Sequence, residues 1–149
     1  MSEQENIQLV RNAYDSFKRG DIAAVISSLA DDIKWVTPGP PEVFPMAGTW
    51  NGHDGVMQFF SKLDGAEEIQ MFEPGDFLAD GERVVAFVKF GGKVKSTGIS
   101  FTSDLVHIFT IRNGKVNEFQ EYYDTAAALT AYAANPSVLA HNSVATTLS

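Results

Sequence analysis

The chain has 149 residues, 44% hydrophobic and 20% charged, which is the composition of one globular domain. Its formal net charge of −8 argues against nucleic acid or an anionic membrane as a partner, because both need clustered Lys and Arg. The absence of cysteine excludes disulfides, thiol nucleophiles and thiolate metal sites, and no apolar run approaches the roughly 18 residues of a membrane span.

The N-terminal stretch MSEQENIQLV is polar and acidic, unlike the basic and then apolar pattern of an export signal. Together with the lack of cysteine, this predicts a cytoplasmic protein. Ser2 and Glu5 fit a capping box that begins a helix, and Gly20 ends the helix. Its buried stripe is predicted from the helical spacing of Ile7, Val10, Tyr14 and Phe17.

Asp21 can cap a second, shorter helix, and residues 33–37 form a predicted strand that ends at Pro38. The next segment, residues 38–52, holds four of the six prolines, so we predict an irregular loop of the kind that often serves as a lid. A third helix is predicted from apolar residues at helical spacing, namely Val56, Phe59, Phe60 and Leu63.

From residue 66 onward, apolar and polar residues alternate, as is typical of strands. Turn signals divide this region into antiparallel strands at 67–79, 83–90, 94–111 and 115–123, with turns at Asp80-Gly81, Gly91-Gly92 and Asn113-Gly114. Asp124 can cap a last helix that stops near Asn135-Pro136. We therefore predict one α+β domain over residues 1–134, with helices on one face of a sheet, and a tail over residues 135–149.

Three segments carry a family resemblance: RGDIAAVISSLADDIKWV, GTWNGHDGVMQFF and VHIFTIRNGKVNEFQEYYD. In order and spacing, residues 5–132 resemble the SnoaL-like branch of the nuclear transport factor 2-like superfamily. The resemblance implies a strongly curved, mostly antiparallel sheet that three N-terminal helices wrap into a cone. It also implies an apolar small-molecule ligand in a pocket at the wide end, and a homodimer formed through the sheet.

The resemblance also assigns site residues. The SnoaL-type polyketide cyclases place an aspartate on the last strand and a histidine on the strand before it, and the matching positions here are Glu121 and His107. In ketosteroid isomerases the base, the helix-one tyrosine and the protonated aspartic acid match Thr37, Ala13 and Val106, while Tyr14 and Asp104 lie nearby but out of register. We therefore do not carry isomerase activity over. The superfamily's epoxide hydrolases need an arginine between two aspartates, and no arginine here is suitably placed.

Whether His107 and Glu121 share a face depends on the turn between their strands. A two-residue turn at Asn113-Gly114 puts them on opposite faces, whereas a three-residue loop from Arg112 puts them on one face, with His107 opposite Phe119. Hydrophobic matching favours the first register and the resemblance favours the second. We adopt the second, noting that a bulge further along the hairpin gives the same result.

With this choice, Glu121 moves a proton next to a substrate carbonyl, and His107 orients it or stabilises the enolate oxygen. The predicted walls of the pocket are Phe17, Trp35, Thr37, Phe109, Phe119 and Tyr123. The alternatives are an exposed carboxylate and a structural histidine, in a protein that only binds small molecules or acts as a dimeric interaction domain. We expect no metal, because the three histidines lack ligand spacing, and no cofactor, because nucleotide-binding motifs are absent.

Overall fold

The computed structural model describes residues 1–133 as an α+β domain with six strands and four helices. In chain order, the elements are α1 (Glu3–Lys18), α2 (Ile22–Ser27), β1 (Leu29–Thr37), β2 (Gly48–Asn51), α3 (Gly52–Ala66), β3 (Glu67–Asp80), β4 (Arg83–Val94), β5 (Ser100–Arg112), β6 (Lys115–Tyr122) and α4 (Thr125–Tyr132). The predicted tail, residues 135–149, and the predicted helix end near Asn135-Pro136 lie outside the described residues.

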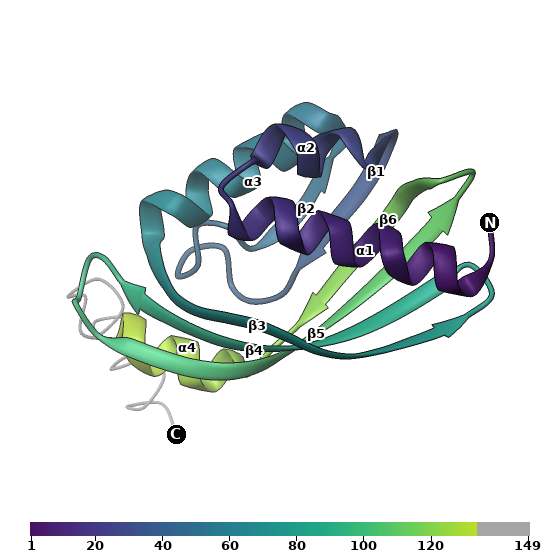
Figure 1. The fold of residues 1–149 in the computed structure, drawn as a ribbon. Helices are drawn as coiled ribbons and strands as arrows, with labels where there is room; N and C mark the ends of the chain where they lie inside the picture. Colours follow the sequence, from purple (N-terminus) through teal and green to yellow (C-terminus); the bar gives the residue numbers. More distant parts are fainter. Residues whose placement is uncertain (134–149) are drawn as a thin grey trace, which may run out of the picture.

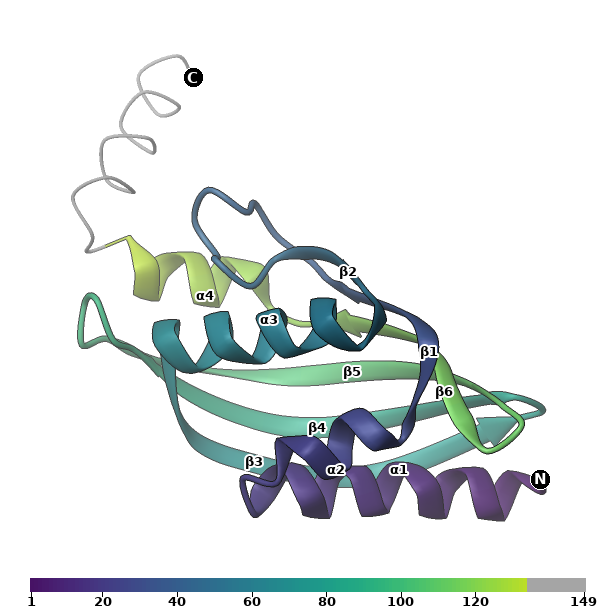
Figure 2. The same ribbon diagram turned by 90° about the horizontal axis from the view of Figure 1, so that it is seen from above.

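The strands form one curved sheet in the order β2-β1-β6-β5-β4-β3, in which only the described β1–β6 pair is parallel. Helices α1, α2 and α3 lie on the concave face of this sheet, and α4 lies at the end where β3 begins (Figure 1). Seen from above, α1 and α3 run along the sheet with α2 close to α1 (Figure 2). The predicted fold class and the three wrapping helices are confirmed.

The core lies between the helices and the concave face, and aliphatic side chains from both layers are fully buried there, including Val10, Ile33, Val56, Val84 and Val116. Removing this apolar surface from water is the main force that holds the helices against the sheet.

Local polar signals set the helix starts. Ser2 Oγ accepts from the Glu5 N–H at 3.1 Å and Glu5 Oε1 accepts from the Ser2 N–H at 3.0 Å, so the predicted capping box is present. Asp21 caps α2 through the Ala24 N–H, and Asp124 caps α4 in the same way through the N–H three residues later. Both predicted caps are confirmed.

Part of the predicted loop is a strand. Residues 48–51 form β2, which pairs with β1 so that Trp50 lies opposite Trp35. The prediction of an irregular loop over all of 38–52 is wrong because the four prolines end at Pro45, and β2 has every backbone N–H that a ladder needs. The Trp50 indole donates to the Met46 carbonyl at 2.9 Å, which closes the short connection.

The predicted turn at Gly91-Gly92 is also wrong. Strand β4 continues through both glycines to Val94, and the chain turns at 95–99, where Gly98 has φ +73°. A Cβ on Gly92 would lie 2.9 Å from the Phe90 ring and 3.0 Å from Glu67 Oε1. Glycine is therefore needed at residue 92 for close packing inside a strand rather than for a turn.

The β5–β6 hairpin has a two-residue turn in place of the predicted three-residue loop. Asn113 and Gly114 both have positive φ, 51° and 73°, and Arg112 pairs with Lys115 across a two-residue turn. The prediction of a three-residue loop is wrong, because Asn-Gly adopts the left-handed region at both central positions and matches the twist of the strands.

A bulge beyond this turn restores the predicted face. The register shifts between Thr110 and Ile111, and Asn117 is the additional residue on β6. From there on, His107 lies directly opposite Glu121 and not, as predicted, opposite Phe119. An extra residue in one strand reverses the alternation of its side chains relative to the partner, so His107 and Glu121 share the concave face.

Candidate functional site

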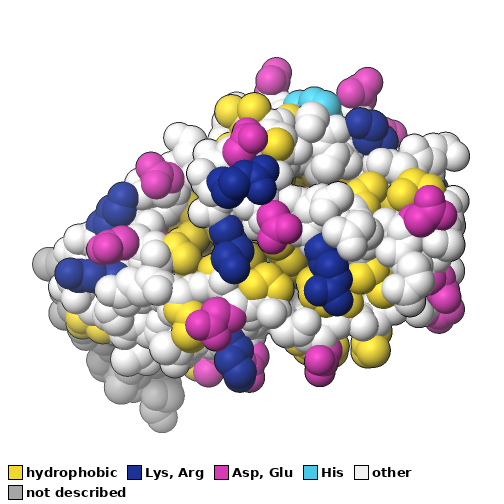
Figure 3. Space-filling model, in the orientation of Figure 1, with side chains coloured by type: hydrophobic (Ala, Val, Ile, Leu, Met, Phe, Trp, Pro, Cys, Tyr) yellow, Lys and Arg dark blue, Asp and Glu magenta, His cyan; other side chains and the backbone are white. Residues whose placement is uncertain are grey.

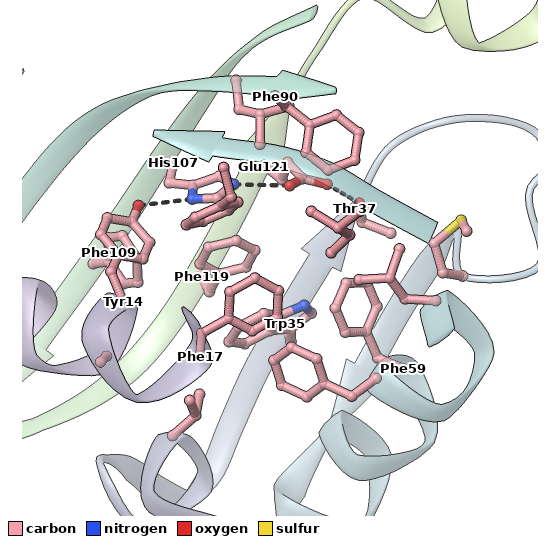
Figure 4. A pocket seen from close by; sticks show the side chains of 18 of the residues that line it. Tyr14, Phe17, Trp35, Thr37, Phe59, Phe90, His107, Phe109, Phe119 and Glu121 are labelled. Atoms are coloured by element: carbon pink, nitrogen blue, oxygen red, sulfur yellow. Dashed lines mark hydrogen bonds and ion pairs between the residues drawn. The ribbon is translucent and has the colours of Figure 1, made fainter. Parts of the chain in front are cut away.

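A cavity opens between the concave face of the sheet and helices α1 and α3. Its walls are mainly apolar and rich in aromatic rings, with phenylalanines from both layers around Trp35 (Figure 4). The centres of water-sized molecules can occupy about 100 Å³ of it, several times the roughly 10–15 Å³ that one water needs by the same measure. On the outside, hydrophobic side chains are visible among charges of both signs on the face that carries α1 (Figure 3). The cavity therefore suits a small, largely apolar molecule.

Four polar side chains form one hydrogen-bonded row in this cavity (Figure 4). The Tyr14 hydroxyl lies 2.8 Å from His107 Nδ1, and His107 Nε2 lies 2.8 Å from Glu121 Oε2. The other carboxylate oxygen, Oε1, accepts from the Thr37 hydroxyl at 2.6 Å. We call this row, Tyr14–His107–Glu121–Thr37, the polar row.

The bonding pattern defines the protonation of the row. Thr37 donates to one oxygen of Glu121 and His107 Nε2–H to the other, an arrangement that suits an ionised carboxylate. When the ring carries its hydrogen on Nε2, His107 Nδ1 accepts from the Tyr14 hydroxyl. Burial, together with the charge of Glu121, raises the pKa of Tyr14, so the tyrosine keeps the proton that it donates. The tautomer with the ring hydrogen on Nε2 thus satisfies every polar side-chain atom of the row.

Strand register brings Thr37 to Glu121. In the parallel β1–β6 pair, Trp35 lies opposite Phe119, and their rings stack with centroids 3.8 Å apart. Because side chains alternate along a strand, the residues two positions further on, Thr37 and Glu121, lie on the same face as the stacked rings. The apolar stack thus sets the position of the polar contact.

The structure places all eight predicted site residues in the wall of this one cavity. They come from α1, β1, β5, β6 and the residue after β6, and they are Phe17, Trp35, Thr37, His107, Phe109, Phe119, Glu121 and Tyr123. Their catalytic and ligand-binding roles remain predictions.

Tyr14 is the member of the polar row to which we assigned no role. The isomerase comparison placed Ala13 at the position of the helix-one tyrosine, yet it is Tyr14 that contacts the histidine, with only 6% of its surface exposed. The available signal was its place on the predicted apolar stripe, where a hydroxyl must find a partner on burial. The other near match, Asp104, is exposed and pairs with Lys89 at 3.2 Å.

A second buried acid also faces the cavity. Glu67, the first residue of β3, is 7% exposed and accepts a hydrogen bond from the Tyr132 hydroxyl at 2.8 Å. Burial raises the pKa of Glu67, the Tyr132 bond opposes this shift, and the charge of Glu121 adds to it. The sequence offered no motif that would have distinguished Glu67 from other glutamates.

Two further findings concern residues 1–133 only. No group of three His, Asp or Glu side chains is arranged to hold a metal ion, and His53 instead contacts the Leu29 carbonyl at 2.9 Å. None of the helices in this range is long and apolar enough to cross a membrane.

Comparison with known proteins adds to this geometry. A profile of the SnoaL-like domain family matches residues 10–119. A solved NTF2-like protein from Burkholderia xenovorans LB400 is 39% identical, with a TM-score of 0.80 over 89% of this chain and 98% of its own. TerC, solved with polyporic acid, is 28% identical, with a TM-score of 0.75 over 86% of this chain and 98% of its own. An uncharacterised protein of Mycobacterium tuberculosis is 24% identical over 86% of this chain and 95% of its own.

Proposed function

The chain belongs to the SnoaL-like domain family, and we propose that it is a cofactor-free enzyme that transfers a proton next to the carbonyl of an apolar small molecule. The observation that carries the proposal is the polar row, which holds one carboxylate between two donors inside an aromatic cavity. The aromatic walls fit an aromatic or otherwise flat substrate. The similarity to TerC, which was crystallised with polyporic acid, supports a ligand of this kind.

In the proposed reaction, Glu121 takes a proton from the carbon next to the carbonyl. The C–H electron pair becomes the enolate double bond, and the carbonyl π electrons move to the oxygen. The protonated Glu121 then returns the proton, either to the same carbon or to another carbon of the conjugated system, so that no external reagent is needed. General acid–base catalysis by one positioned group typically contributes on the order of 10²–10⁴ in rate.

His107 acts in this scheme by positioning. Its Nε2–H already donates to Glu121 and its Nδ1 already accepts from Tyr14, which fixes the ring and its tautomer. Of the two roles predicted for His107, orienting Glu121 therefore fits the geometry better than stabilising an enolate oxygen. Thr37 fixes the carboxylate from the opposite side.

Exchange of the methyl protons of acetophenone for deuterium, followed by proton NMR, tests the proposal. We expect the wild-type protein to accelerate this exchange, and Glu121→Gln to bind acetophenone but lose at least about 10²-fold in exchange rate. The matched control is Glu118→Gln, which changes an exposed glutamate on the same strand and should leave the rate unchanged. Full exchange activity in Glu121→Gln would refute the assignment.

A second candidate function is binding without chemistry. The observation that favours it is that every nitrogen and side-chain oxygen of the polar row already has a partner within the row, as in a purely structural network. The same experiment separates the two candidates, because a binder shifts the NMR signals of acetophenone without accelerating exchange. The cavity also disfavours the interaction-domain alternative, for which the pocket should be filled by the protein's own side chains.

A further inference from the structure

The second buried acid, Glu67, has one oxygen that the protein does not use. Its Oε2 accepts from the Tyr132 hydroxyl of α4, and this bond fixes the orientation of the carboxyl group. No donor among residues 1–133 bonds to Oε1. Glu67 lines the same cavity as the polar row, although it comes from the start of β3 rather than from the β5–β6 hairpin.

The surroundings of Glu67 favour the neutral acid. Within the described part of the chain, no Lys, Arg or His forms an ion pair with it, and the wall of the cavity that it lines is mostly apolar, with Phe90, Phe101 and Leu105 among its members. Burial raises its pKa, the Tyr132 hydrogen bond opposes part of this shift, and the negative charge of Glu121 in the same cavity raises the pKa again, so that the net direction is upward. Because Tyr132 donates to Oε2, the proton of the neutral acid resides on Oε1.

Glycine at residue 92 leaves space for the carboxyl group of Glu67. A Cβ on Gly92 would lie 3.0 Å from Oε1, so any other residue at that position would press on the carboxyl group. The glycine in the middle of β4 therefore leaves Glu67 room beside the Phe90 ring.

The polar row cannot supply a hydrogen bond to a ligand carbonyl without breaking one of its own. With the ring hydrogen of His107 on Nε2, the Tyr14 hydroxyl, His107 Nε2–H and the Thr37 hydroxyl are all already donated. The wall has one further unpartnered donor among the described residues, the Trp35 indole N–H, which is fully enclosed. A buried acid with a free O–H is thus the group best able to bind an acceptor oxygen.

We propose that Glu67, as a neutral carboxylic acid, donates a hydrogen bond from Oε1 to the carbonyl oxygen of the molecule in the cavity. This inference rests on the proposed function and specifies its substrate class, namely neutral aromatic ketones or quinones whose oxygen only accepts hydrogen bonds. Glu121 then faces the carbon and Glu67 the oxygen of the same carbonyl compound. As the enolate forms, the oxygen gains negative charge and the bond from Glu67 strengthens, while the proton stays on Glu67.

A matched pair of probes tests the hydrogen bond. Acetophenone and α-methylstyrene have the same shape, but the second has a CH₂ group in place of the carbonyl oxygen. NMR titration gives the ratio of their affinities for the wild-type protein, Glu67→Leu and Glu67→Gln. We expect the preference for the ketone to fall about tenfold in Glu67→Leu, and to persist in Glu67→Gln, whose amide can donate to the ketone while still accepting from Tyr132.

A pH series makes the test independent of the folding of Glu67→Leu. The ketone cannot donate, so the wild-type preference should disappear as pH rises through the raised pKa of Glu67 and the acid loses its proton, whereas Glu67→Gln should keep the preference. The other titratable groups near Glu67 are Tyr132, Tyr123 and Glu121. Burial raises the pKa of both tyrosines, so they remain protonated while Glu67 titrates.

Two results would overturn the inference. One is an unchanged ketone preference in Glu67→Leu, together with the same pH dependence in the wild-type protein and Glu67→Gln. The other is a preference that is lost in Trp35→Phe but kept in Glu67→Leu, which would identify the indole as the donor. Failure of the proposed function is separate, because it would appear as absence of deuterium exchange whatever the affinity ratio.

Discussion

At the residue scale, we expect Tyr14 to determine which ring nitrogen of His107 carries the hydrogen. Tyr14→Phe keeps the ring contacts, such as the edge-on packing at 5.5 Å against Phe72, but leaves His107 Nδ1 without its donor. An unpaired buried polar atom costs about 1–3 kcal/mol, so we expect the free energy of unfolding to fall by about that amount. We also expect the exchange kcat to fall about tenfold with little change in KM, because the loss acts on the orientation of Glu121.

Nitrogen NMR of His107 separates this positioning role from a general loss of stability. With Tyr14 present, the ring should carry its hydrogen on Nε2, whereas Tyr14→Phe should show a mixture of tautomers or a charged ring. Tyr122→Phe is the matched control, because it removes a hydroxyl from a half-exposed tyrosine on β6. If Tyr14→Phe left both the tautomer and kcat unchanged, the hydroxyl would be only a packing contact.

The identities of His107 and Glu121 could be predicted from the sequence, but their exact pairing could not. The two turns that fit Asn113-Gly114 predict opposite faces, and the observed turn alone would have separated the pair. The bulge at Asn117 brings them together, and nothing in the local sequence marks it. Bulges depend on packing across the whole sheet, so a resemblance was needed to choose the face.

At the element scale, the Tyr132–Glu67 bond joins α4 to the start of β3 and makes stability depend on pH. Burial raises the pKa of Glu67 above its value in the unfolded chain. The folded state therefore keeps a proton that the unfolded state releases, and this contribution to stability is lost as pH rises through the folded pKa. Glu67→Gln has no such proton to lose. As pH rises, its free energy of unfolding should therefore increase relative to that of the wild-type protein.

Urea unfolding from about pH 5 to about pH 9 measures this difference, and Tyr14, Tyr123 and Tyr132 do not interfere, because desolvation raises the pKa of each hydroxyl. Glu68→Gln, which changes the exposed neighbour on β3, is the control and should run parallel to the wild-type curve. A Glu67→Gln curve that also ran parallel would mean that Glu67 is ionised throughout the range.

Element boundaries were predictable where one residue determines them. Ser2, Asp21 and Asp124 cap their helices within one turn of chain, so the sequence alone locates them. Strand β2 and the position of the β4–β5 turn depend on distant partners: β2 pairs with β1, and β4 continues through Gly91 and Gly92 because it pairs with β3 as far as Val94. Local propensity carries no information about such contacts.

At the scale of the whole molecule, alternating and helical patterns along the chain were enough to predict helices on one face of an antiparallel sheet, and the family resemblance predicted its curvature and the three wrapping helices. The cavity, which the resemblance also predicted, lies between this curved sheet and the helices. The patterns do not predict what covers the convex face of the sheet, which points away from the helices. Only the resemblance predicts a contact there, with a second copy of the chain.

We expect this convex face to form a homodimer. It carries two large exposed side chains on the two strands that flank β5, Phe87 of β4, which is 41% exposed, and Tyr122 of β6, which is 52% exposed, on either side of Val106. Burying such side chains against a second copy would remove apolar surface from water, which stabilises a complex by about 25 cal/mol per Å².

Light scattering should therefore give twice the mass of the chain for the wild-type protein and for Met57→Glu, which adds a charge on the helical side. Phe87→Glu should give a monomer that still exchanges acetophenone protons, because Phe87 does not line the cavity. A wild-type monomer would mean that the convex face is left free, and a Phe87→Glu dimer would place the interface on another surface.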